Sequence, residues 1–193
     1  MIKLFFDTEF TGLKKNTTLI SIGIVAEDGR WFYAEFTDYD RKSCDDWIQE
    51  NVIQNLISKG RITKNLVQTA VGNALYSVQM CDTTDNIRKE LTTWLESFGE
   101  HELQFVSDVS HYDFVLLLDI FGGAFSLPKN VSPACHDINQ DLARRFNMTE
   151  KEAFDLNREN VVANFRSEMP DGEKHNSLFD ARIIKLLYEI CNH

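Results

Sequence analysis

Three short apolar runs at the start of the chain do most to limit the folds it can adopt. They cover residues 2–6, 19–25 and 30–36, and each contains the β-branched or aromatic residues that are typical of strands. The Asp28-Gly29 step between the second and third runs is characteristic of a tight hairpin. The sequence therefore predicts that the chain begins with a meander whose second and third strands are antiparallel neighbours.

Patterns of helical spacing follow the meander and alternate with one further strand. Ser43 resembles a helix cap, and apolar residues from Trp47 to Ile57 recur at helical spacing, which predicts a helix that ends near Ser58. The segment 59–83 has no clear pattern. The other expected elements are helices over 87–98, 112–121 and 137–146, a strand over 103–107, a helix capped by Thr149 and Glu152, a loop over 166–176 and a last helix over 178–191. This alternation predicts an α/β layer structure.

Length and composition predict a single folded domain over residues 1–193. A chain of 193 residues is long enough to bury a core, and only 3 prolines and 9 glycines argue against long disordered stretches. No window reaches the roughly 18 consecutive apolar residues of a membrane span, and Met1 leads directly into a strand pattern. We therefore expect a cytoplasmic protein that does not associate with membranes.

The cysteines and the net charge argue against further classes of protein. The four cysteines are scattered without C-x-x-C spacing, so neither a zinc site nor a redox motif is predicted. A formal net charge of -10 argues against non-specific binding of polyanions, because such binding usually depends on a basic surface. We expect nucleic acid to bind such a chain only where divalent cations supply positive charge.

Asp7 and Glu9 form the most informative acidic pair in the sequence. Side chains two residues apart in a strand point to one face, so these two carboxylates would lie together and repel each other unless a divalent cation were bound. The spacing alone carries little weight, because residues 38–40 and 100–102 repeat it in expected surface segments. The pair at 7 and 9 differs because aromatic residues flank it on both sides, where unpaired charges would be costly. A metal site is the favoured interpretation.

The segment from Phe6 to Leu13 resembles the first motif of the DEDDh group of 3′-5′ exonucleases, a strand ending in Asp-x-Glu and followed by Thr and Gly. A second motif of that group places an aspartate after an aromatic residue, and Asp113 fits it within the run from 110 to 116. The third motif is His-x4-Asp near the C-terminus, which His175 and Asp180 match. The three motifs occur in the family's order and span almost the whole chain.

The third acid of this set has competitors. Asp108 lies at the end of the strand expected over 103–107, and Asp119 lies further along the same helix as Asp113. Taken alone, Asp113 could simply interact favourably with the N-terminus of its helix, and His175 could be a solvated loop histidine. Asp113 is our preferred residue because it falls in the first turn of an apolar helix directly after a strand.

The resemblance implies a site and a chemistry. Asp7, Glu9, Asp113 and Asp180 would hold two Mg²⁺ ions, with Mn²⁺ as a substitute and with Asp7 shared between them. His175 would act as the general base near neutral pH. Residues that follow the first acid would contact the terminal base or sugar; these are Thr8, Phe10 and Leu13. Packing at the end of the strand is the alternative for Phe10 and Leu13.

The resemblance also implies a fold and a substrate. The fold would be ribonuclease H-like, with a mixed sheet that begins as an antiparallel meander and has helices on both faces, and with the acids gathered at one sheet edge. The chain is similar to small bacterial and phage exoribonuclease domains, which implies release of nucleoside 5′-monophosphates from single-stranded or 3′-overhanging RNA. A DNA exonuclease of the proofreading or repair type is an alternative, and a catalytically idle binding domain of the same fold is another. Relatives often form homodimers, so we also expect that this chain can form one.

Overall fold

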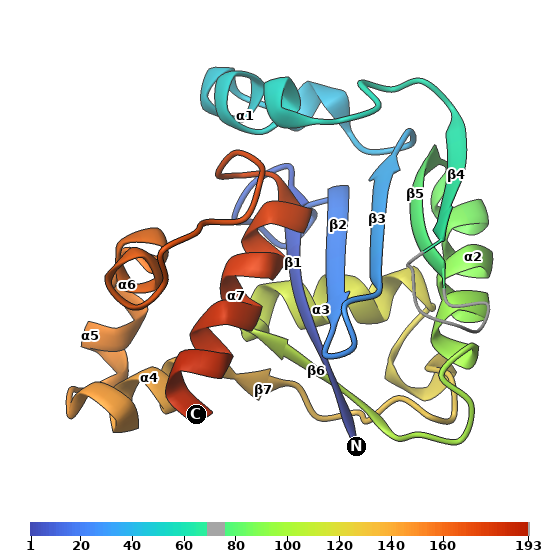
Figure 1. Ribbon diagram of the computed structural model, residues 1–193. Helices are drawn as coiled ribbons and strands as arrows, with labels where there is room; N and C mark the ends of the chain where they lie inside the picture. The colour runs from blue at the N-terminus through green and yellow to red at the C-terminus, as the bar shows by residue number, and fades with distance from the viewer. Residues whose placement is uncertain (69–75, 193) are drawn as a thin grey trace.

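A mixed sheet forms the centre of the computed structural model, which describes residues 1–68 and 76–192 (Figure 1). Within these residues the sheet has seven strands in the order β4-β5-β3-β2-β1-β6-β7. β1 therefore lies inside the sheet, with neighbours on both sides. The strands are β1 Ile2–Phe10, β2 Leu19–Ala26, β3 Trp31–Phe36, β4 Thr63–Gln68, β5 Tyr76–Asp82, β6 Leu103–Ser107 and β7 His136–Asp137.

The predicted meander is confirmed. β1 pairs antiparallel with β2, placing Phe5 opposite Val25, and β2 pairs antiparallel with β3. β6 joins the other side of β1 in parallel, with Phe5 opposite Val106. Because β1 and β6 run in the same direction, their C-terminal ends open at the same edge of the sheet. The edge at which the acids were expected is thus formed by strand ends, and it does not lie along an outermost strand.

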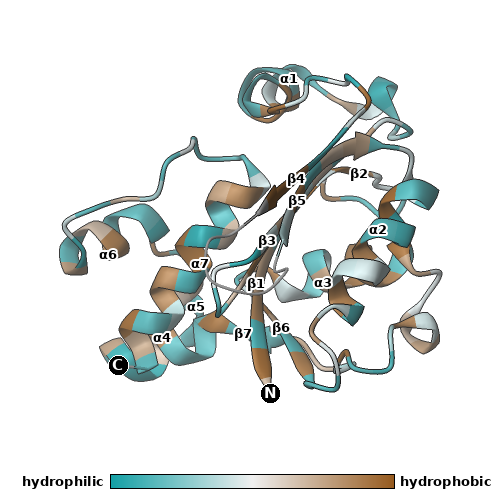
Figure 2. Cartoon of the chain, turned by 45° about the vertical axis from the view of Figure 1, so that its right-hand side comes forward, coloured by the Kyte–Doolittle hydropathy of each residue, from teal (hydrophilic) through white to brown (hydrophobic). Residues whose placement is uncertain are grey.

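Helices cover both faces of the sheet, as predicted. α2 and α3 pack on one face, and α7 packs on the other together with α4, α5 and α6 (Figure 1). The helices are α1 Asp46–Asn51, α2 Thr84–Glu96, α3 Ser110–Ile120, α4 Ile138–Phe146, α5 Glu150–Phe154, α6 Arg158–Phe165 and α7 Ser177–Asn192. Figure 2 shows apolar residues concentrated along β1 and β6, between the two helical layers. In the described part of the chain no helix combines the length and the apolar character that crossing a membrane requires.

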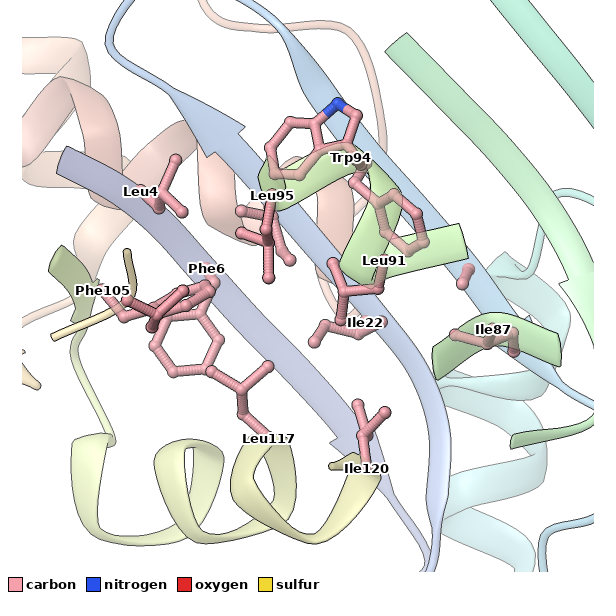
Figure 3. Close-up of a cluster of buried hydrophobic side chains, with 14 of the residues drawn as sticks. Leu4, Phe6, Ile22, Ile87, Leu91, Trp94, Leu95, Phe105, Leu117 and Ile120 are labelled. Carbon is pink, nitrogen blue, oxygen red and sulfur yellow. The ribbon is translucent and has the colours of Figure 1, made fainter. Parts of the chain in front are cut away.

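Successive residues of β1 enter two different cores. Phe6 packs with Phe105 and Leu117 in the core beneath α2 and α3, which also contains Trp94 (Figure 3). Phe5 points the other way, into the core formed with α4, α6 and α7. Burial of both faces anchors β1 firmly, because each fully buried aromatic side chain contributes about 1.5 to 3 kcal/mol. The acidic end of β1 therefore extends from a rigid strand.

The helix expected between Ser43 and Ser58 is wrong in both of its boundaries. Asp45 is the cap, because its side chain accepts a hydrogen bond from the backbone N–H of Ile48 at 2.9 Å. α1 ends at Asn51, and a 3-10 turn, η2, follows over Ile53–Asn55. Apolar residues continue at intervals of four across this break and pack on Ile20, so the spacing hid the change of helix type; they are Ile48, Val52 and Leu56.

The structure also tests the predictions for residues 59–83, for the helix capped at Thr149 and for the loop before α7. β4 and β5 occupy much of the segment 59–83, and they pair antiparallel; residues 69–75 of that segment lie outside the described residues. The capping box at Thr149 and Glu152 is confirmed. The helix it begins is short, and α6 follows as a separate helix. Residues 166–176 contain no helix or strand, as expected for the loop that precedes α7.

Gly23 allows the start of α7 to lie directly on β2. A Cβ atom added to Gly23 would come within 2.3 Å of the backbone of Ser177 and Leu178. At the same contact the hydroxyls of Ser21 and Ser177 are 3.0 Å apart and hydrogen-bonded. Asp7 pairs with Gly23 in the sheet, so this close approach brings the first turn of α7 next to the acidic end of β1.

We predict that Gly23→Ala destabilises the protein by roughly 3 kcal/mol, because its methyl group would collide with backbone that cannot rotate away. Gly99→Ala is the matched control. It has a φ of +66° and nothing within 4 Å of an added Cβ, so it tests backbone strain without a collision and should cost about 1 kcal/mol. Urea unfolding measures both variants. A cost for Gly23→Ala no larger than that of the control would contradict this role.

Candidate active site

Asp7 and Glu9 lie near the end of β1 and point to the same face of the sheet, because side chains two residues apart in a strand share a face. Both are partly buried. Burial raises the pKa of Asp7 well above its usual value, and the charges of Asp113, Asp180 and Glu9 raise it further. Burial, followed by the charges of Asp180 and Asp113, raises the pKa of Glu9 as well. A negative charge on either residue is unfavourable unless a cation lies nearby.

Asp180 and His175 join Glu9 from the other side of the site. Asp180 lies in the first turn of α7, which Asn176 caps by accepting a hydrogen bond from the N–H of Leu178 at 3.1 Å. The backbone N–H of His175 donates to Asp180 Oδ2 at 2.9 Å. One potential metal-ligating atom from each of Glu9, His175 and Asp180 lies within 4.8 Å of the other two. The structure thus brings the His-x4-Asp pair against the first motif.

Asp113 is almost fully buried in the first turn of α3. Its Oδ1 accepts a hydrogen bond from the Thr8 hydroxyl at 2.6 Å, and its Oδ2 accepts one from the Ser107 hydroxyl at 2.5 Å. These bonds favour the charged form, but burial outweighs them and raises the pKa of Asp113 to about 7. Burial and the charge of Asp108 likewise raise the pKa of Asp180 to about 7. Each carboxylate is held in place, yet its charge is poorly compensated by the protein.

The competitors for the third acid occupy different places. Asp108 lies beside the site, where carboxylate oxygens of Asp7, Asp108 and Asp113 are within 4.8 Å of one another. Unlike Asp113, it pairs with a cation, since its Oδ2 accepts a hydrogen bond from Arg158 Nε at 3.1 Å. Asp119 is exposed on α3 and belongs to neither carboxylate cluster of the described residues. The structure therefore brings Asp113 and Asp108 to the site and leaves Asp119 away from it.

Two amide side chains hold the loop that carries His175. Asn55 Nδ2 donates to the carbonyl of Lys174 at 2.8 Å, and Asn176 Nδ2 donates to the carbonyl of Asn55 at 2.8 Å. His175 itself adopts a φ of +63°, which is unfavourable for a residue with a side chain. Its ring meets the ring of Trp47 edge to face at 5.0 Å. Burial, with the charge of Lys174, lowers the pKa of His175, so the neutral imidazole predominates near pH 7.

A cleft of about 620 Å³ opens above the acids. Aromatic and apolar side chains line it, including Trp47, Tyr112, Phe10 and Leu13, and the rings of Phe10 and Tyr112 stack at 5.6 Å. Leu13 is 74% exposed and free to contact a ligand. The Thr8 hydroxyl, in contrast, is buried against Asp113. The cleft thus combines an acidic floor with apolar walls.

Among the cleft residues that sequence reasoning missed are one exposed tryptophan and two cations. Trp47 was expected on the apolar face of a core helix, but it is 54% exposed and lines the cleft. The buried residues Ile48, Val52 and Leu56 are spaced by four, and Trp47 falls outside this series. That offset is the signal that could have separated Trp47 from the core. Arg158 and Lys174 also line the cleft, and no motif in the sequence marks either of them.

The donor set fits hard divalent cations. The acids provide oxygen ligands, which Mg²⁺ and Mn²⁺ prefer, and their mutual repulsion is what such cations relieve. The hydroxyl bonds to Asp113 are of the kind that orients a ligating carboxylate. Two groups of potential ligands meet at the floor of one cleft, as chemistry with two cations requires.

Comparison with known proteins agrees with this geometry. Two proteins of Mycobacterium tuberculosis are similar to the chain: the 3′-5′ exoribonuclease Rv2179c of strain H37Rv and the 3′-5′ exoribonuclease MT2234.1 of strain CDC 1551. Each is 28% identical to it over 139 residues, which is 72% of this chain and 73% of the relative. The crystal structure of the nuclease domain of 3′hExo, a DEDDh family member bound to rAMP, has the same fold, with a TM-score of 0.61. That structure is 16% identical in sequence, and the match covers 98% of this chain and 93% of that domain.

A family model for the 3′-5′ exoribonuclease Rv2179c-like domain matches residues 2–191. This match includes β1 with its two acids, the start of α3 with Asp113 and the loop and helix that carry His175 and Asp180. It also fits the ribonuclease H-like fold expected from the sequence, with its mixed sheet and two helical layers. From its sequence, its fold and its acidic cleft, the chain is an exonuclease that belongs to the Rv2179c-like family of 3′-5′ exoribonuclease domains.

Proposed function

We propose that this exonuclease removes nucleoside 5′-monophosphates one at a time from the 3′ end of RNA. The observation that carries the proposal is the meeting of two potential metal-ligand clusters at the floor of one aromatic cleft. RNA is the first candidate because the similar mycobacterial proteins are exoribonucleases and the structure of similar fold is bound to rAMP. We also propose that residues 1–193 act as one domain, because β1 and α7, at opposite ends of the chain, both supply the site.

Asp7, Glu9, Asp113 and Asp180 are the proposed ligands of two divalent cations, Mg²⁺ with Mn²⁺ as a substitute. The charges of both Asp113 and Asp180 act on Asp7, which supports a shared role for Asp7 between the two clusters. The cations, when bound, supply positive charge to the attacking and leaving oxygens of an in-line displacement at phosphorus. The carboxylates position that charge, and the Thr8 hydroxyl keeps Asp113 in orientation.

His175 is the proposed general base. Its lowered pKa keeps a ring nitrogen free to accept a proton from the attacking water near neutral pH. The bonds from Asn55 and Asn176 hold its loop against η2, and the Trp47 ring limits the positions of the imidazole. The base is therefore preorganised beside Glu9 and Asp180, which reduces the cost of reaching a reactive geometry.

The cleft walls are the proposed site of the terminal nucleotide. Trp47 and Leu13 are both largely exposed there and offer flat and apolar contacts for a base. Phe10 stacks on Tyr112 and extends the same surface towards the sugar. Stacking of this kind accepts any base, so we expect the enzyme to shorten strands with little dependence on sequence.

We predict stepwise shortening of a 5′-labelled single-stranded RNA when Mg²⁺ or Mn²⁺ is present, and slower shortening of a DNA strand of the same sequence. Asp7→Ala should abolish cleavage of both strands. Asp119→Ala is the matched control, because this exposed acid lies outside both clusters, and it should cleave at the wild-type rate. Equal rates on RNA and DNA would reject the proposed preference, and no cleavage of either strand with either metal would reject the enzymatic function.

A second prediction concerns His175→Ala, which should slow cleavage by about 10²- to 10⁴-fold while calorimetry finds Mn²⁺ affinity nearly unchanged. With Mg²⁺ at saturation, so that the carboxylates stay charged, the wild-type rate should fall when the pH drops below about 6.5, the ordinary pKa of histidine, because the pKa of His175 is lowered and the neutral form persists. His101→Ala, an exposed histidine outside the cleft, serves as the control. Loss of metal binding in His175→Ala would show that His175 is a ligand and not the base.

A further inference from the structure

Arg158 is an enclosed and well-anchored cation of the cleft. It is the first residue of α6, and its side chain is only 12% exposed although it lines the cleft. Its Nε donates to Asp108 Oδ2 at 3.1 Å, one terminal nitrogen donates to the carbonyl of Ala153 at 2.5 Å, and the other donates to Asn139 Oδ1 at 2.6 Å. Contacts from α4, from α5 and from the residue after β6 therefore determine the direction of the guanidinium.

The partners of Arg158 are themselves held in place. Asn139 Nδ2 donates to the backbone carbonyl of Asp108 at 2.7 Å and to Asp137 Oδ1 at 2.8 Å. With both of its amide hydrogens directed at these acceptors, Asn139 presents its oxygen to Arg158. Asp137 in turn caps α4. This arrangement is more extensive than a surface ion pair needs, and it lies next to the acidic floor of the cleft.

We propose that Arg158 binds the phosphate of the 3′-terminal nucleotide and that Asp108 is the residue that positions it, not a metal ligand. The inference rests on the proposed function, in which that phosphate lies at the acids. One carboxylate oxygen of Asp108 lies within 4.8 Å of one oxygen each from Asp7 and Asp113, and Asp108 also pairs with Arg158, so Asp108 lies between Arg158 and the proposed ligands. A guanidinium has five N–H donors, and three are engaged by protein, which leaves two for phosphate oxygens.

A count of charges supports this division of roles. The four proposed ligands carry four negative charges, which two divalent cations balance, whereas Asp108 and Arg158 balance each other as a separate pair. Asp113 differs from Asp108 because both of its oxygens accept bonds from neutral hydroxyls, so its negative charge stays available to a cation. When both cations are bound, a phosphate that enters the site therefore meets no net negative charge from these five acids.

Arg158 is also better placed for this role than Lys174, another cation that lines the cleft. The Lys174 side chain is 53% exposed and pairs with Glu159 at 3.2 Å at the surface. Long exposed side chains lose conformational entropy when they bind, while an anchored guanidinium has already lost it. For a chain with a net charge of -10, one preorganised cation at the phosphate matters more than a mobile one at the rim.

The test compares the dissociation constants of adenosine 5′-monophosphate and adenosine, measured by calorimetry with Mg²⁺ present. The wild-type protein should prefer the monophosphate. Arg158→Gln should reduce this preference at least tenfold while adenosine binds as before, and Arg158→Lys, which keeps the charge and the stem, should reduce it less. Asp108→Asn should also reduce it but should retain Mn²⁺ affinity within about twofold, whereas Asp113→Asn should lose Mn²⁺ affinity.

Arg166→Gln is the matched control, because Arg166 pairs with Glu189 at 3.1 Å at the other end of α6 and does not line the cleft. Its preference for the monophosphate should equal that of the wild type. If Arg158→Gln does not fold, as judged by circular dichroism, Arg158→Lys still reports on the preference. A full preference in the Arg158 variants would overturn the role of Arg158, and loss of Mn²⁺ affinity in Asp108→Asn would overturn that of Asp108. A wild-type protein without any preference for the monophosphate would instead reject the proposed site as a whole.

Discussion

Repulsion among the carboxylates at the end of β1 is the constraint on which the rest of the site depends. Asp7, Glu9, Asp113 and Asp180 are crowded and partly or fully buried, and burial raises the pKa of each one. Such a cluster costs stability in the absence of cations. The fold tolerates it because its acids extend from elements that are anchored elsewhere: Phe5 and Phe6 hold β1 in two cores, and α7 packs against β1 and β2.

The topology explains how distant parts of the chain reach one site. β1 and β6 are parallel neighbours, so their C-terminal ends meet, and α3 begins three residues after β6 ends. Gly23 removes the side chain that would separate α7 from β2, which brings Asp180 to the same edge. Asn176 both caps α7 and bonds to Asn55, which holds the His175 loop. The positions of Asp180 and His175 are therefore linked. Ligand and base are thus placed by the same local contacts.

Local patterns in the sequence predicted most of the helices and strands well, because these depend on short-range signals, whereas the set of acids and the ribonuclease H-like fold were predicted from the resemblance to a family. The Asp28-Gly29 turn, the strand over 103–107 and the capping box at Thr149 appear in the structure as expected. The break after α1 was missed because buried residues keep their spacing of four through it. Arg158 could not have been found, because its partners at Asp108, Asn139 and Ala153 meet only in three dimensions.

The most direct measurement of the central claim is the thermal unfolding midpoint between pH 5 and 8, with EDTA or with Mg²⁺, for the wild type and Asp7→Asn. A carboxyl whose folded pKa is raised contributes stability at low pH that is lost as the pH rises towards that pKa, which is about 7 for Asp113 and Asp180. We therefore expect the metal-free wild type to lose stability relative to Asp7→Asn as the pH rises. Mg²⁺ should restore that stability most strongly at pH 8, and much less in Asp7→Asn. Parallel curves for the two proteins, with no effect of Mg²⁺, would contradict a site built for divalent cations.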